Sequence, residues 1–185
     1  MSLAIVNRPP VPVATKLAYA VGGLSDSLKT FSFTTFLLFY YTTVLGLPGT
    51  LLALAMSVGL VWDAAVDPLI GHFSDQATIR FGRRHSFMLA GAVCAGASFV
   101  AVFNPPAGLS TTALFAWLMV SSLALRSSNS LFMVPYAALG AELTSDYDER
   151  TSISGYRAGT IIVGTLLATA AAFLGVLRND PAAAT

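Results

Sequence analysis

The sequence predicts an all-α protein, a polytopic bundle of five transmembrane helices, and three observations lead to this fold class. Of the 185 residues, 55% are apolar and only 10% are charged, whereas a soluble domain carries about 25% charged residues. The mean hydropathy is +0.72. The apolar residues also gather in five stretches, and each approaches the length of about 20 residues that crosses a bilayer. Composition therefore argues against a soluble enzyme, and a net charge of +1 offers no basic surface for nucleic acid.

The transmembrane bundle is predicted to cover residues 17–178, with helices at 17–45, 49–72, 86–103, 109–141 and 153–177. Short turns rich in glycine and proline, at 46–49 and 104–108, separate the first helix from the second and the third from the fourth. These turns predict two antiparallel hairpins. The other two connections are longer and charged, which is typical of loops that stay in the cytoplasm.

Positive charges predict the orientation of the bundle, because lysine and arginine gather in cytoplasmic loops. One side of the predicted membrane carries six of them: Arg8, Lys16, Arg80, Arg83, Arg84 and Arg150. The other side carries only Arg178. We therefore expect a multi-pass protein of the cell (inner) membrane, in contact with the lipid bilayer. Its tail at 1–16 is predicted to be cytoplasmic, and after five crossings its short tail at 179–185 is predicted to be external.

Two carboxylates inside the second helix are the strongest functional signal. Asp63 and Asp67 are four residues apart, so they lie one turn apart on one helix face. A charge at mid-membrane costs about 2.5–3.5 kcal/mol on insertion scales and usually has a function. Two neighbouring carboxylates repel each other, and a shared proton or a small hard cation such as Na⁺ relieves the repulsion. The alternative is a pair of ordinary acids in the headgroup region.

Three further sites place charge within the helices. Asp26 and Lys29 are three residues apart in the first helix and either neutralise each other or line a cavity. Arg126 lies in a serine-rich stretch of the fourth helix, which predicts that it faces the bundle interior. Arg157, at the start of the fifth helix, is either a bidentate anchor for a solute or an interfacial anchor.

The sequence contains no motif of a catalytic site. We find no nucleophile–base pair, P-loop or zinc motif. The single cysteine, Cys94, excludes an internal disulfide or a cysteine-based zinc site and is interpreted as a small packing residue. We therefore expect a protein that is not an enzyme, has no catalytic residues and uses no cofactor. No metal is expected beyond a possible Na⁺ ion.

The loop after the second helix resembles the cytoplasmic signature of the major facilitator superfamily. Its residues are Gly71, Asp75, Gly82, Arg83 and Arg84. In that superfamily the aspartate and arginines form a latch that keeps the cytoplasmic side closed. The resemblance therefore implies a cytoplasmic gate made by these residues.

Other stretches resemble one branch of that superfamily, the glycoside–pentoside–hexuronide cation symporters, which include the melibiose permeases. They are residues 40–47, 62–71, 133–136 and 142–151 followed by Arg157. With them, the resemblance covers most of residues 16 to 160. It implies that Asp63 and Asp67 are cation ligands and that Ser130 is a hydroxyl ligand. It also implies that Arg157 lies beside the sugar.

The chain departs from a melibiose-type permease at the solute. Ser27, preceded by Asp26, and Met133 stand where such a permease has its two sugar-binding aspartates. The chain thus keeps the two acids of the cation site but lacks the acids that bind a galactoside. Both Na⁺ and H⁺ stay possible as the coupling ion. The residues predicted to bind the solute are Asp26, Ser27, Arg126, Met133 and Arg157.

The superfamily fold has two six-helix halves with the substrate between them, so this chain resembles an incomplete N-terminal half. We expect the N-terminal part of a Na⁺- or H⁺-coupled sugar or glycoside symporter, inactive alone, whose partner is a C-terminal half or a companion chain. One alternative is a carrier of lysolipids or other amphipathic solutes in the same superfamily. Another is a truncated membrane module that does not transport.

Overall fold

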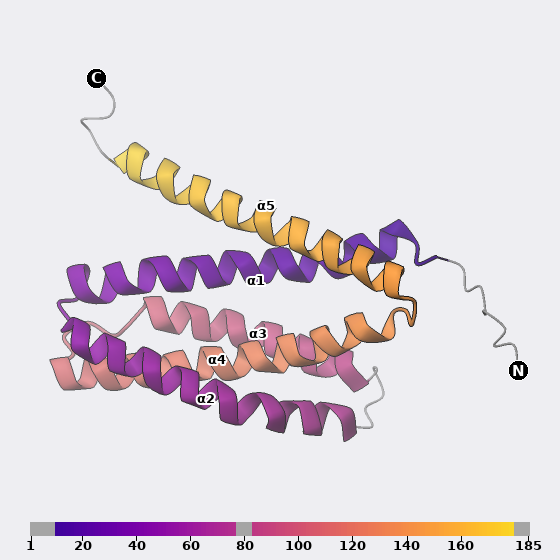
Figure 1. Ribbon diagram of the computed structural model, residues 1–185. Coiled ribbons are helices and arrows are strands. Elements are labelled where there is room, and N and C mark those ends of the chain that lie inside the picture. Colours follow the sequence, from indigo (N-terminus) through magenta and orange to yellow (C-terminus); the bar gives the residue numbers. More distant parts are fainter. Residues whose placement is uncertain (1–9, 77–82, 180–185) are drawn as a thin grey trace, which may run out of the picture. The chain divides into compact units, whose positions relative to one another are not determined.

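The computed structural model describes residues 10–76 and 83–179, and these residues form helices joined by short connections, with no strand among them. The all-helical prediction is therefore confirmed. The elements, in chain order, are α1 (Val13–Phe39), the π-helix η1 (Tyr40–Val44), α2 (Gly49–Gln76), α3 (Arg83–Phe103), α4 (Thr111–Glu142) and α5 (Tyr147–Asn179) (Figure 1).

Three helices in the described part of the chain are long and apolar enough to cross a membrane. Their spans are Gly49–Ser74, Arg84–Phe103 and Tyr147–Leu174. Helices α1 and α4 have 27 and 32 residues, which at 1.5 Å per residue is also long enough to cross a bilayer. They are less apolar because α1 carries Lys16, Asp26 and Lys29, and α4 carries Arg126 among serines. Polarity rather than length therefore distinguishes these two helices.

Three helices begin earlier than the sequence predicts, and for α3 the difference is from residue 86 to Arg83. Helix α1 starts at Val13 rather than at residue 17, because the carbonyl of Pro12 accepts hydrogen bonds from the backbone of Thr15 (2.9 Å) and Lys16 (3.1 Å). Helix α5 starts at Tyr147 rather than at residue 153. Its first turn is capped by Asp146, whose Oδ1 accepts the Glu149 N–H at 3.0 Å. The polar residues 147–152 thus form helix instead of loop.

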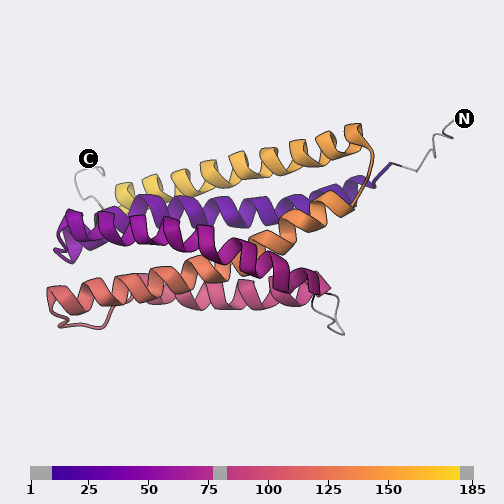
Figure 2. The ribbon, with the colours of Figure 1, turned by 60° about the horizontal axis from the view of Figure 1, so that its bottom comes forward.

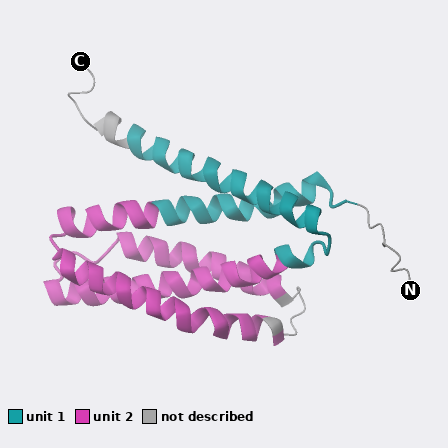
Figure 3. Cartoon of the chain, in the orientation of Figure 1, with its two compact units in different colours: residues 1–31, 140–185 teal, residues 32–139 magenta. Residues whose placement is uncertain are grey.

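The chain divides into two compact units (Figure 3). Unit 1 comprises residues 1–31 and 140–185, so its described part holds the first part of α1, the end of α4 and α5. Unit 2 comprises residues 32–139, which form the end of α1, η1, α2, α3 and most of α4. Each unit therefore has helix packing of its own, and each contains some of the residues with predicted functions.

The apolar core of unit 2 gathers around η1. The Tyr41 side chain is fully buried, and its hydroxyl donates to the carbonyl of Val102 on α3 at 2.7 Å. The wider π turn is closed by the Leu45 N–H, which donates to the Tyr40 carbonyl at 3.0 Å. The buried residues of this core are Leu37, Tyr41, Leu47, Leu52, Ala55, Val102, Leu114, Leu118 and Leu125. They join α1, α2, α3 and α4 at one end of unit 2.

Helices α3 and α4 of unit 2 lie side by side (Figure 2) and approach most tightly at a glycine. A Cβ on Gly91 would lie 2.7 Å from the backbone nitrogen of Phe132 and 2.9 Å from the Ser128 carbonyl oxygen. Backbone atoms cannot move aside as a flexible side chain can. Only glycine therefore permits this approach.

We expect Gly91→Ala to push α3 away from α4 and to lower the free energy of unfolding by about 1–3 kcal/mol, as overpacking does elsewhere. Gly96→Ala, on the same helix, is the matched control, because a Cβ on Gly96 meets no atom within 4 Å. Thermal unfolding in detergent, followed by circular dichroism, measures both variants. Equal melting temperatures for the two alanine variants would contradict the close contact.

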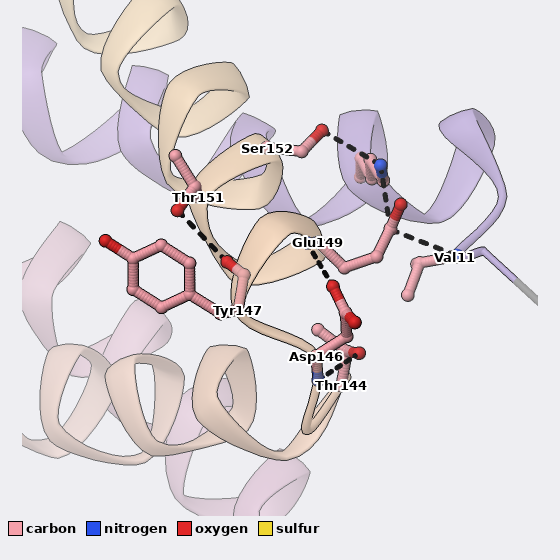
Figure 4. Close-up of polar contacts among 8 residues, drawn as sticks. Val11, Thr144, Asp146, Tyr147, Glu149, Thr151 and Ser152 are labelled. Carbon is pink, nitrogen blue, oxygen red and sulfur yellow. Dashed lines mark hydrogen bonds and ion pairs between the residues drawn. The ribbon is translucent and has the colours of Figure 1, made fainter. Parts of the chain in front are cut away.

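In unit 1 a buried ion pair ties α1 to α5 (Figure 4). Lys16 is only 6% exposed, and its Nζ lies 2.9 Å from Glu149 Oε2 and 2.9 Å from Ser152 Oγ, to which it donates. The same Glu149 oxygen accepts the Val11 N–H at 3.1 Å. The sequence places Lys16 in a cytoplasmic tail, whereas the structure places it inside α1, where it anchors the start of α5.

We expect Lys16→Met to lower the free energy of unfolding by about 1–3 kcal/mol, because the half-buried Glu149 carboxylate loses its charged partner. The double variant Lys16→Met with Glu149→Gln tests the pairing. Residues in direct contact are not additive, so the double variant should lose less than the two single variants together. Strict additivity in thermal unfolding would show that the two charges do not stabilise each other.

Candidate functional site

The predicted cation ligands lie on α2 and α4 of unit 2, which run in the same direction. Near Gly59, a Cβ would lie 2.8 Å from Cζ of Arg126. Three turns further along, a Cβ on Gly71 would lie 3.6 Å from Val134 Cγ1. Between these two contacts, Trp62 Nε1 donates to Ser127 Oγ at 2.8 Å. The register of the two helices is therefore set by contacts both before and after the acidic residues.

Asp63 forms an ion pair across this interface, because Arg126 Nη1 donates to its Oδ2. The side chains of Arg126 and Asp63 are 17% and 31% exposed. Arg126 Cζ also lies 6.0 Å from the centre of the Phe33 ring, which is the range of a cation–π contact. Its Nε is buried and finds no hydrogen-bond partner among the described residues. The charge of Asp63 is thus neutralised by an arginine that lies 63 residues away in the sequence.

Asp67 and Ser130 lie one turn beyond this ion pair, on α2 and α4 respectively. Because the helices are parallel and the contacts at Gly59 and Gly71 flank them, the two residues are at the same level. Asp67 is exposed and Ser130 is buried. The structure therefore brings the three predicted cation ligands onto neighbouring turns of two adjacent helices.

The donors available at this place are oxygen atoms. Within residues 10–76 and 83–179 there is no group of three or more histidine, cysteine or acidic side chains that could hold a metal ion. Two carboxylates and one hydroxyl are a donor set for a hard monovalent cation or a proton rather than for zinc or another transition metal. Cation binding by these residues stays a prediction.

Three of the predicted solute-binding residues lie in unit 1, on α1 and α5. Asp26 is paired with Lys29 of its own helix, with a distance of 2.9 Å between Nζ and Oδ1. The sequence left open whether Asp26 and Lys29 neutralise each other or line a cavity, and the structure shows that they form an ion pair. Ser27 is buried, and its hydroxyl donates to the Leu24 carbonyl at 2.9 Å. Neither residue is bonded to α5 by these contacts.

Arg157, the third, lies on α5 where this helix touches α1. A Cβ on Gly23 would lie 3.1 Å from Arg157 Cγ, so the arginine stem packs directly on the glycine. One turn along, Thr160 Oγ1 donates to the Ala20 carbonyl at 2.7 Å. Arg157 is thus half-buried in unit 1, with its position fixed by the packing of α5 on α1.

The remaining predicted residues are in unit 2 or near its loop. Met133 is half-buried on α4, two residues before Pro135, and α4 runs through this proline as one helix. Gly71 and half-buried Arg84 lie on α2 and α3. Asp75 and Arg83 belong to the same two helices, but their side chains, and Gly82 as a whole, lie outside the described residues. The cytoplasmic gate stays a prediction.

Sequence reasoning did not find the pairing of Asp63 with Arg126. Each residue stands out as a charge in an apolar helix, but the sequence does not give the register of α2 against α4. One local signal existed. Gly59 precedes Asp63 by four residues, so the face that carries the carboxylate also has a gap for a long side chain from another helix.

Comparisons with known proteins identify the family of this chain. Residues 18–183 match the family model described as MFS/sugar transport protein. An uncharacterized symporter of Synechocystis sp. is 32% identical over 158 residues, which are 83% of this chain and 29% of that protein. The sodium-dependent lysophosphatidylcholine symporter 1 of Xenopus tropicalis is 28% identical over 165 residues, 89% of this chain and 31% of that protein.

A third relative, the inner membrane symporter YicJ of Escherichia coli, is 26% identical over 157 residues, 85% of this chain and 34% of that protein. The chain therefore spans about a third of the length of these curated relatives. Their similarity extends over most of this chain, and the family match at residues 18–183 includes α4 and α2 with its two acids.

Proposed function

Because the chain belongs to the MFS/sugar transport protein family, we propose that it is the N-terminal part of a cation-coupled sugar or glycoside symporter. It is part of a multi-pass membrane protein. The names of the relatives support coupled transport, since all three are symporters. We place it in the glycoside–pentoside–hexuronide branch, in an inner membrane with its N-terminus in the cytoplasm. The remaining helices of the transporter would come from a C-terminal half or a companion chain.

The observation that carries this proposal is the alignment of Asp67 with Ser130 one turn beyond Asp63. In the proposed cycle, Na⁺ or H⁺ binds at these oxygens, and its charge offsets the carboxylates that the bilayer otherwise disfavours. The exposed Asp67 is the accessible carboxylate of the pair. Ser130 supplies a neutral oxygen, so the bound cation is not over-neutralised.

The solute is proposed to bind in contact with α1 and α5. Arg157, whose stem is held against Gly23, presents planar donors that suit vicinal hydroxyls or a carboxylate. Ser27 and Asp26 add a hydroxyl and an acid on α1. Asp75 with Arg83 and Arg84 would hold the cytoplasmic side closed in the outward-open state. Rocking of the two halves then opens the binding site alternately to the two sides of the membrane, as in other transporters of this type.

We expect Asp63→Asn and Asp67→Asn to abolish the stimulation of uptake by the coupling cation, because each removes one carboxylate from the proposed site. The measurement is uptake of radiolabelled glycosides by cells that express the complete transporter, with Na⁺ and pH varied separately. Asp148→Asn is the control, since Asp148 is an exposed acid at the start of α5. Unchanged cation dependence in both site variants would exclude this ion site.

A second function, transport of an amphipathic lipid such as a lysolipid, is favoured by one feature of unit 2. A groove of about 200 Å³ between the end of α1 and the start of α2 is lined almost entirely by apolar residues, among them Phe33, Leu37, Leu52 and Met56. Met133 replaces an expected acid on α4. The lysophosphatidylcholine symporter of Xenopus tropicalis also matches 89% of this chain.

Binding competition distinguishes the two solutes. If the carrier takes amphipathic lipids, unlabelled lysophosphatidylcholine should displace radiolabelled lysolipid from the purified transporter, and glycosides should not. Leu52→Gln should then weaken lysolipid binding by about tenfold, because a polar group in an apolar groove loses its hydration. Displacement of a bound glycoside by other glycosides, with no effect of Leu52→Gln, would favour the sugar instead.

A further inference from the structure

The symport cycle described above leaves one charged residue of unit 2 without a role. A guanidinium is a cation, and that of Arg126 already holds the Asp63 carboxylate that a coupling cation would need. Two cations at one carboxylate repel each other, most strongly where the dielectric constant is low. The presence of the guanidinium therefore affects any cation that binds at Asp63.

We propose that Arg126 is the resident counter-ion of Asp63 and that the coupling Na⁺ ion binds by displacing its guanidinium. This inference rests on the proposed function, because it takes Asp63 as a cation ligand. Without Na⁺, Arg126 neutralises Asp63. With Na⁺ bound, the ion neutralises Asp63 and the guanidinium turns away. Sodium binding thus releases the guanidinium from Asp63 as an unpaired positive charge.

The first support is that Arg126 is held incompletely. A guanidinium has five N–H donors and forms its strongest contacts as a bidentate pair with a carboxylate. The contacts found for this one are a single nitrogen on Asp63 and the edge of cation–π range to Phe33. Its Nε is buried and finds no acceptor among the described residues. A buried donor without an acceptor costs about 1–3 kcal/mol, so an ion pair of this kind is easier to displace.

The second support is the space that the guanidinium occupies. It lies over Gly59, where a Cβ would be only 2.8 Å from Arg126 Cζ and 2.9 Å from Cδ. The arginine reaches Asp63 because position 59 has no side chain. The obstructed atoms belong to the outer part of a flexible side chain, so it can turn away while the α2 and α4 backbones stay in place. Gly59 thus permits the ion pair, and a substitution at this position can obstruct it in an experiment.

The experiment measures Na⁺ affinity in the purified protein in lipid nanodiscs, by equilibrium dialysis with radioactive Na⁺. Arg126→Gln removes the competitor, and Gly59→Ala keeps the arginine but obstructs its position. We expect both variants to bind Na⁺ about tenfold more tightly than the wild type, the equivalent of one charged hydrogen bond. Gly96→Ala, the same substitution on α3 with no neighbour within 4 Å, should keep the wild-type affinity.

Two further measurements make the outcome decisive. Tryptophan fluorescence without Na⁺, compared with that of the wild type so that the contribution of Trp117 is common to both, reports whether the contact of Trp62 with Ser127 survives. It shows whether a variant is folded around the site; if one variant misfolds, the other decides. Wild-type or weaker Na⁺ affinity in the folded variants would overturn the displacement. Asp63→Asn tests the proposed function separately. If that variant alone binds Na⁺ like the wild type, the cation site is elsewhere and the symport proposal loses its ion site.

Discussion

The cost of an isolated charge inside a membrane is the constraint on which the other features of this chain depend. Charged groups at mid-bilayer are unfavourable by several kcal/mol unless they are paired or face water. The structure shows two solutions for the charges that the sequence places within the predicted spans. Lys29 pairs with Asp26 one turn away, and Arg126 pairs with Asp63 from another helix. In both cases the charge that marks the site in the sequence is neutralised by a specific partner.

Pairing between helices requires that the helices come close, and small residues make this possible. Gly59 makes room for the arginine that reaches Asp63, and Gly23 lies against the stem of Arg157. Gly91 brings the backbones of α3 and α4 together. Lipid supplies no hydrophobic force that presses helices together, so van der Waals contact at such glycines contributes a large part of the association. The glycines therefore allow the close helix contacts across which charged side chains can pair.

The sequence predicts most of this fold because helix existence depends on local hydropathy. The order of the helices, the short turns after residue 45 and residue 103, and the positions of Asp63 and Asp67 follow from local patterns. Helix ends are less predictable. The start of α5 at Tyr147 depends on one capping aspartate within a polar stretch that looks like a loop. The start of α1 likewise depends on the Pro12 carbonyl.

The candidate site is predictable only in its parts. Spacing along α2 gives the two carboxylates, and a family resemblance adds Ser130, but neither gives the register of α2 against α4. That register depends on contacts between residues far apart in the chain, such as Trp62 with Ser127 and Gly59 with Arg126. The pairing of Asp63 with Arg126 therefore cannot be predicted from the sequence, although it neutralises the Asp63 carboxylate in this structure.

The pairing also separates the two acids into different roles. Asp63 begins neutralised by a guanidinium, whereas Asp67 is exposed and has no ion pair among the described residues. In the proposed cycle, an incoming cation is attracted first to the uncompensated charge of Asp67, and a cation held there then competes with Arg126 for Asp63. The two carboxylates would thus act in sequence: Asp67 would attract the ion, and Asp63 would exchange its arginine for the ion.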